Sequence, residues 1–162
     1  MQATIPVRTT QRSFPSSFTG RVYMGMCWVT AAIFLYSASS KIINIYGFGL
    51  ILDSYGLIPE AWNKPLSILI PIMELLISAG MLYFPFAALA AGGAGLLVAA
   101  FTTVLLWKWG EVLPYGCGCF GPGTAREVGY WDITKNACLL IVVGYLLIYR
   151  LLFWRRFRIK SG

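Results

Sequence analysis

Four long apolar segments constrain the fold of this chain more than any other feature. They run roughly over residues 22–40, 66–82, 86–107 and 133–153. Each is close to the ~20 helical residues that cross a ~30 Å hydrocarbon core. The segments are rich in Leu, Ile and Ala and do not alternate between apolar and polar residues, which favours helices over barrel strands. The sequence therefore predicts an all-α membrane protein, folded as a four-transmembrane-helix bundle.

The composition agrees with a membrane protein. Only 12% of the 162 residues are charged, whereas soluble domains average about 25%. The formal net charge of +7 does not indicate nucleic acid, because the basic residues gather near the two ends of the chain, as membrane-flanking residues do. We expect a polar N-terminal tail over residues 1–20, a transmembrane domain over 21–153 and a basic C-terminal tail over 154–162.

The distribution of basic residues predicts the orientation. Three arginines precede the first segment and five basic residues close the chain: Arg8, Arg12, Arg21, Arg150, Arg155, Arg156, Arg158 and Lys160. The long connections over residues 42–65 and 108–132 carry basic and acidic residues in near balance. By the positive-inside rule, both termini are cytoplasmic and both long connections face outward.

Cys117 and Cys119 are the residues that most clearly offer chemistry. They lie one residue apart in an outward-facing, glycine-rich connection, in a compartment where disulfides persist. Gly118 relaxes the backbone enough for the two Cα atoms to reach disulfide distance. We expect the two to bond to each other, as a redox pair or as an inert structural disulfide. A metal held with outside ligands is a third interpretation, and separate bonding to another cysteine is a fourth.

The remaining residues limit or extend this chemistry. The chain has no His, which excludes bis-His haem and His-ligated metals. Cys138 lies about one helical turn inside the fourth segment, where it is either a resolving thiol for the pair or a buried apolar residue. Cys27 is expected to be a packing residue far from the pair.

Glu74 is the one carboxylate inside an apolar segment, and such residues usually face the bundle interior and find a partner. Lys41, at the outer end of the first segment, is the obvious candidate. Helical rise places the two ~10 Å apart along the membrane normal, which strains a direct bond. A neutral Glu74 bonded to Tyr36 or Ser37 is the alternative. The carboxyl is either a proton or quinone site or a polar clasp that fixes helix register.

Together these residues resemble the DoxX-like membrane proteins. The matching motifs are Arg21, Ser40-Lys41, Tyr55-Gly56-Leu57-Ile58-Pro59 and Pro71-Ile72-Met73-Glu74-Leu75. Cys117-Gly118-Cys119-Phe120-Gly121 narrows the resemblance to the MauE (methylamine utilisation) family, over about residues 21–150.

The resemblance implies a multi-pass protein of the bacterial inner membrane that acts with a periplasmic thioredoxin-like partner. Cys117 and Cys119 would form or transfer disulfides, or pass electrons, for an exported or membrane redox protein. No cofactor is expected to stay bound, and contact with a quinone is left open. The residues do not decide between an oxidoreductase and a non-catalytic accessory or assembly subunit of a respiratory or photosynthetic complex.

Overall fold

The computed structural model describes residues 18–121 and 123–160. Within them, four helices are long and apolar enough to cross a membrane, which confirms the predicted bundle. They are α1 (Phe18–Ile43), α3 (Glu60–Leu82), α4 (Ala87–Trp107) and α5 (Tyr130–Lys160). Most of the predicted N-terminal tail lies outside the described residues. The predicted C-terminal tail begins inside α5, which continues to Lys160.

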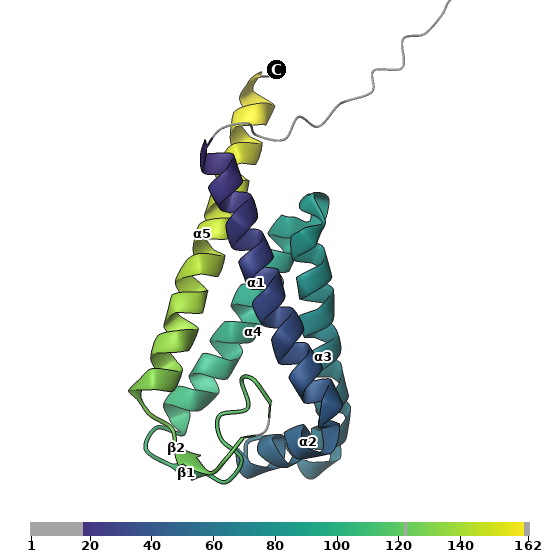
Figure 1. Ribbon diagram of the computed structural model, residues 1–162, viewed down its shortest axis with the longest axis vertical. Helices are drawn as coiled ribbons and strands as arrows, with labels where there is room; N and C mark the ends of the chain where they lie inside the picture. Colours follow the sequence, from purple (N-terminus) through teal and green to yellow (C-terminus); the bar gives the residue numbers. More distant parts are fainter. Residues whose placement is uncertain (1–17, 122, 161–162) are drawn as a thin grey trace, which may run out of the picture.

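The connection over residues 42–65 is not the plain loop that the sequence suggested. It contains a fifth helix, α2 (Ile45–Ser54), which lies across one end of the bundle (Figure 1). The side chain of Asn44 caps this helix by accepting a hydrogen bond from the amide of Gly47, at 2.9 Å, and such a cap favours helix initiation. At ten residues, α2 is too short to span a bilayer.

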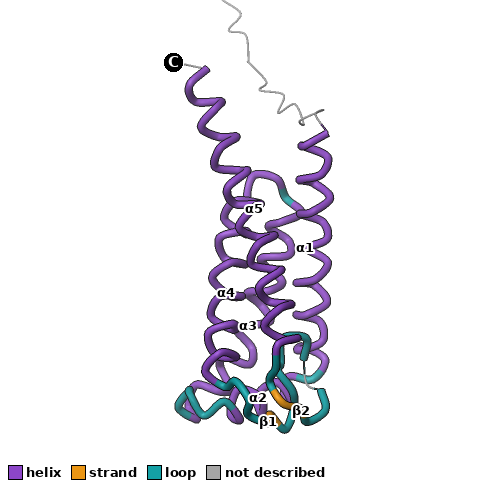
Figure 2. Tube along the Cα trace, turned by 90° about the vertical axis from the view of Figure 1, so that its left-hand side faces the viewer, coloured by secondary structure: helices purple, strands orange, loops and turns teal. Residues whose placement is uncertain are grey.

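The four long helices pack as two antiparallel pairs, α1 with α3 and α4 with α5. The two ends of the described chain lie at the same end of the bundle, the terminal end, and α2 lies at the opposite end, the loop end (Figure 2). Near the terminal end α1 meets α5, where the rings of Tyr23 and Tyr149 stack with centroids 4.8 Å apart. Toward the loop end these two helices diverge (Figure 1).

The connection from α4 to α5 folds back between the diverging helices. Two short strands near its ends, β1 (Val112–Leu113) and β2 (Arg126–Glu127), pair as an antiparallel hairpin. Leu113 lies opposite Arg126. A 3₁₀ turn, η1 (Phe84–Phe86), joins α3 to α4. The sequence did not predict the hairpin, whose two-residue strands are too short to show a period.

Two apolar clusters form the core. The first fills the bundle toward the terminal end and includes Tyr23, Cys27 and Phe34 of α1. The second joins α2, the end of α4 and the hairpin, through Phe48, Ile51, Leu105, Leu113 and Val128, among others. Cys117 and Cys119 pack against the second cluster. The helix α2 and the connection that carries the cysteines therefore form one packed layer at the loop end.

Candidate functional site

The segment that carries the two cysteines, residues 116–121, is termed the CGC loop below. Three of its glycines have positive φ: Gly116 at 75°, Gly118 at 65° and Gly121 at 89°. Residues with a Cβ rarely adopt this backbone conformation. The glycines therefore allow two tight reversals, and these bring the backbone of the CGC loop against α1 and α2.

Two of these glycines also permit a close approach that a side chain would prevent. A Cβ at Gly118 would lie 2.7 Å from Cγ2 of Ile51, on α2. A Cβ at Gly121 would collide with the hydroxyl of Ser40, on α1. The glycines of the Cys117–Gly121 motif are therefore needed both for the conformation of the loop and for its docking.

Side chains of α1 and of the residue after α2 hold the backbone carbonyls of the CGC loop. The Tyr55 hydroxyl donates to the carbonyl of Cys117 at 2.6 Å. Ser37 Oγ donates to the carbonyl of Cys119 at 2.7 Å, and Ser40 Oγ donates to that of Phe120, also at 2.7 Å. Partners from two distant parts of the chain thus fix the loop through its backbone.

Lys41 and Glu74 form a direct ion pair, so the expected axial gap of ~10 Å is wrong. Lys41 Nζ lies 2.5 Å from Glu74 Oε1, and both side chains are buried. The expectation assumed that the two helices end at the same membrane level. Glu74 lies fourteen residues, or about 21 Å, into α3, whereas Lys41 lies near the end of α1. The helix α3 therefore projects beyond α1, and α2 packs against this projecting part.

The ammonium group of Lys41 is fully partnered. It also donates to Ser37 Oγ at 2.8 Å and to the carbonyl of Cys119 at 3.2 Å, which uses its three protons. The rings of Phe48 and Phe101 each lie 5.3 Å from Nζ and add cation–π contacts. Lys41 therefore connects the buried carboxylate to the backbone of the CGC loop.

Glu74 has one bonded and one unbonded oxygen. Oε1 accepts from Lys41. Ser37 Oγ lies 3.1 Å from Oε1 and directs its single proton either there or to the carbonyl of Cys119, so Ser37 is the partner that the sequence offered as an alternative. Tyr36 is not, since its side chain is exposed and its ring lies 6.2 Å from that of Phe120. Oε2 is buried and has no hydrogen-bond partner within the described residues.

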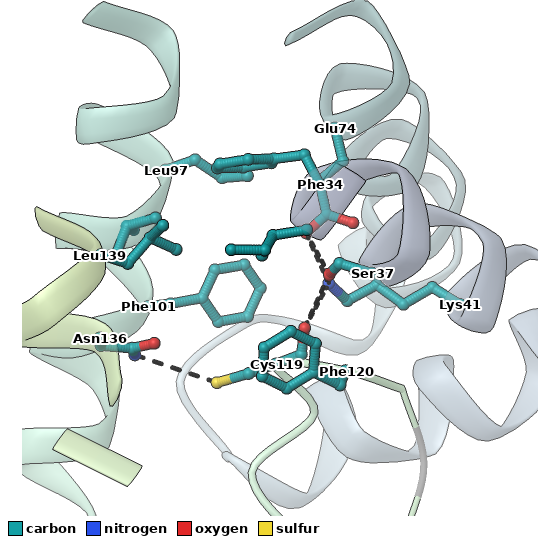
Figure 3. A pocket seen from close by; sticks show the side chains of 12 residues that line it. Phe34, Ser37, Lys41, Glu74, Leu97, Phe101, Cys119, Phe120, Asn136 and Leu139 are labelled. Carbon is teal, nitrogen blue, oxygen red and sulfur yellow. Dashed lines mark hydrogen bonds and ion pairs between the residues drawn. The ribbon is translucent and has the colours of Figure 1, made fainter. Parts of the chain in front are cut away.

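Cys117 and Cys119 are both thiols in this structure and are half-buried. The sulfur of Cys119 is directed toward α5, where Asn136 Nδ2 lies 3.9 Å from it (Figure 3). A hydrogen bond to Cys117, together with burial, raises the pKa of the Cys119 thiol, and Lys41 and Asn136 oppose this rise. The formation of a disulfide between the two residues stays a prediction.

The other two cysteines lie apart from the pair. Cys138 is exposed, so its expected burial is not found. It follows Asn136 by two residues, about 200° around the helix, which directs it away from the face of α5 that meets Cys119. Its assignment as a resolving thiol gains no support from this placement. Cys27 is buried in the first apolar cluster, as expected for a packing residue.

A small cavity of about 40 Å³ lies between the ion pair and the cysteine (Figure 3). Its polar walls are Ser37, Lys41, Glu74, Cys119 and Asn136, and its apolar walls include Phe34, Leu97, Phe101 and Leu139. Sequence reasoning missed Asn136. The only available signal was an amide side chain near the start of an otherwise apolar segment.

The described residues contain no group of three His, Cys, Asp or Glu side chains that could hold a metal ion. The chemistry of the site therefore rests on two thiols, one ion pair and several neutral hydrogen-bond donors. This arrangement can form and break disulfides and can exchange protons within a buried volume.

Comparisons with known proteins show where this chain has relatives. The family model described as methylamine utilisation protein MauE matches residues 19–149. The methylamine utilization protein MauE of Paracoccus denitrificans is 25% identical to the chain over 123 residues. That match covers 74% of this chain and 61% of the relative, so the chain spans less than two thirds of the relative's length. No solved structure matches the chain significantly.

Proposed function

This chain belongs to the MauE family, and on that premise we propose that it is a membrane thiol–disulfide carrier whose working groups are Cys117 and Cys119. The pair would exchange a disulfide with a dithiol of an exported or membrane redox protein. The observation that carries the proposal is the attachment of the CGC loop. Its carbonyls are held by Ser37, Ser40, Lys41 and Tyr55, which fixes the backbone on which the two thiols are carried.

The surroundings of the thiols support an order of reaction. A hydrogen bond to Cys117 and burial raise the pKa of the Cys119 thiol. The thiolate is the nucleophile in disulfide exchange, so we propose that the Cys117 thiolate reacts first. It attacks one sulfur of a partner disulfide and forms a mixed disulfide. The Cys119 thiolate then attacks Cys117, which closes the internal disulfide and releases the partner as a dithiol. In the reverse direction the same steps deliver a disulfide to the partner.

Location and partner are part of the proposal. The basic residues at both ends of the chain favour cytoplasmic termini, which places the loop end on the outer side of a bacterial inner membrane. There the pair would meet a periplasmic thioredoxin-like protein. Repeated delivery of disulfides requires reoxidation of the pair, and a quinone dissolved in the bilayer is the two-electron, two-proton acceptor that we propose.

Trapping of the mixed disulfide tests this function. The Cys119→Ser variant should retain the nucleophile but lose the internal attack, so it should accumulate a disulfide-linked complex with its partner in membranes. Cys117→Ser should trap much less. The complex should disappear on reduction and should be absent from the double variant. Full disulfide transfer by both single variants would rule the proposal out.

A non-catalytic accessory or assembly subunit is the second candidate function. One observation favours it: an apolar groove of about 580 Å³ between α3 and α4, lined by Leu76, Gly80, Leu89 and Gly93, among others. In the nearby part of α4, Gly92 is exposed and a Cβ there would meet nothing within 4 Å, so the bundle itself does not need this glycine. Variants of the two cysteines that remain active but leave a larger complex would support this function.

A further inference from the structure

Glu74 has a feature that a purely structural clasp does not require. Its side chain is 4% exposed, yet Oε2 has no hydrogen-bond partner among the described residues. An unpaired buried carboxylate oxygen is costly. Glu74 and Cys119 line the same cavity, so the residue with the uncompensated acceptor and the residue whose thiol reacts second share one volume.

Asn136 stands on the other side of this cavity. It is 8% exposed, and its amide nitrogen lies 3.9 Å from Cys119 Sγ. An N–H group directed at sulfur stabilises a thiolate more than a thiol. Figure 3 shows the sulfur directed toward Asn136, with Ser37, Lys41 and Glu74 on the opposite side.

We propose that this cavity is a proton-transfer site, in which Glu74 takes the proton of Cys119 when the internal disulfide closes and Asn136 holds the resulting thiolate. This inference rests on the proposed function, since it describes the second step of the exchange. At about 40 Å³, the cavity exceeds the 10–15 Å³ that a cavity needs to hold a water molecule. Water can therefore relay the proton from Sγ to Oε2.

The charges around the cavity favour Glu74 over bulk solvent as the acceptor of the Cys119 proton. Among the lining residues, Lys41, Glu74 and Cys119 are those that ionise. Loss of the Cys119 proton to solvent would add a net negative charge to an apolar site, which is costly. Transfer to Glu74 leaves one cation, Lys41, and one anion, the thiolate, so the net charge of the cavity does not change.

The step balances without an added reactant. The S–H bond of Cys119 breaks and an O–H bond forms at Glu74. The Cys119 thiolate attacks Cys117 Sγ of the mixed disulfide, a new S–S bond forms, and the electron pair of the broken S–S bond leaves on the partner sulfur. That sulfur takes up a proton from water, and Glu74 releases its proton to water, which restores the ion pair with Lys41. The cysteine pair is oxidised by two electrons, and the partner disulfide is reduced.

A two-phase reaction tests the proposal on the full chain in lipid nanodiscs. The reduced protein, carrying Cys138→Ala to remove the exposed thiol, is mixed with equimolar 4,4′-dithiodipyridine. The first thiopyridone released reports the attack by Cys117, and the second reports the closure by Cys119. Mass spectrometry verifies that the product is the internal disulfide.

Glu74→Gln should slow the second thiopyridone release by about 100-fold, which is the lower end of the effect expected for loss of a general base. The first release should be unchanged. The rate of the second release should also become more strongly dependent on pH, since hydroxide then replaces the carboxylate. Ser78→Ala is the matched control. It removes a buried hydroxyl of the same helix that donates to the carbonyl of Ala31 at 2.8 Å, away from the cavity, and should leave both releases unchanged.

An unchanged second release in Glu74→Gln would overturn the proton transfer. If that variant does not fold, Asn136→Leu decides, because it should slow the second release at least several-fold without the change in pH dependence, and an unchanged rate would again overturn the proposal. A wild-type protein that releases no thiopyridone would instead contradict the proposed function itself.

Discussion

Lys41 Nζ lies 3.2 Å from the carbonyl oxygen of Cys119, a residue 78 positions later in the chain. The same ammonium group is paired with Glu74. One buried cation therefore links α1, α3 and the CGC loop, and the stability of the bundle and the position of the thiols depend on the same side chain.

Removal of this cation should destabilise the fold strongly. Lys41→Met leaves the carboxylate of Glu74 buried without its counter-charge, and breaking a buried pair in this way costs about 3–5 kcal/mol. Thermal unfolding in detergent should show a large loss for this variant. Lys108→Met is the matched control, because it breaks a pair with Glu111, which is 54% exposed, and such pairs contribute about 0–1 kcal/mol. Equal losses in the two variants would contradict the role of Lys41.

The glycines of the CGC loop should resist substitution. Gly118→Ala and Gly121→Ala combine a positive φ with a steric conflict against Ile51 or Ser40, and the backbone conformation alone costs roughly 1–2 kcal/mol. The loop should detach from α1 and α2, which proteolysis and thiol labelling will detect as faster cleavage and faster alkylation of Cys119. Gly129→Ala, where an added Cβ meets nothing within 4 Å, should behave as wild type.

The Cys119 thiol should titrate at a raised pH. Because the hydrogen bond to Cys117 and burial raise the pKa of Cys119, its alkylation should require a higher pH than alkylation of an ordinary exposed thiol. In Cys117→Ala the largest cause of the rise is removed, so the pKa of Cys119 should fall and its alkylation should shift to lower pH. Peptide-resolved mass spectrometry after pulses of iodoacetamide at several pH values measures both. A Cys119 profile that does not move in Cys117→Ala would refute Cys117 as the cause of the raised pKa.

The orientation of the bundle can be tested in intact cells. If both termini are cytoplasmic, an impermeant maleimide should label Cys117 and Cys119 after mild reduction, without permeabilisation of the inner membrane. Cys27 is buried near the terminal end and should stay unlabelled in the native protein. Labelling of the pair only after permeabilisation would show the opposite orientation.

The sequence was sufficient for the spans but not for the loop end. Hydropathy placed the four long helices to within a few residues at most ends, because membrane-spanning length is a one-dimensional property. The pairing of Lys41 with Glu74 was mispredicted in geometry because it depends on how far α3 projects beyond α1. The projecting part of α3 lies beside α2, a helix that hydropathy did not distinguish from a loop.

The cysteine site likewise has features that the sequence predicts and features that depend on tertiary contacts. Cys117 and Cys119 were recognisable from their spacing, and Gly118 from its flexibility. The hydroxyl groups that hold the loop come from Ser37, Ser40 and Tyr55, more than sixty residues away, and single-sequence patterns do not report contacts over such separations. Asn136 lies only 17 residues from Cys119, but an amide near the start of an apolar segment does not reveal which group it faces.

The positions of these residues along the chain have a consequence for synthesis. Lys41, Ser37 and Glu74, which bond to one another, all leave the ribosome before the CGC loop is translated. The first helical hairpin can therefore enter the bilayer with its two buried charges already neutralising each other. The hydroxyl and ammonium groups that will receive the loop are then in place, and the cysteines dock last, onto a surface assembled by the first half of the chain.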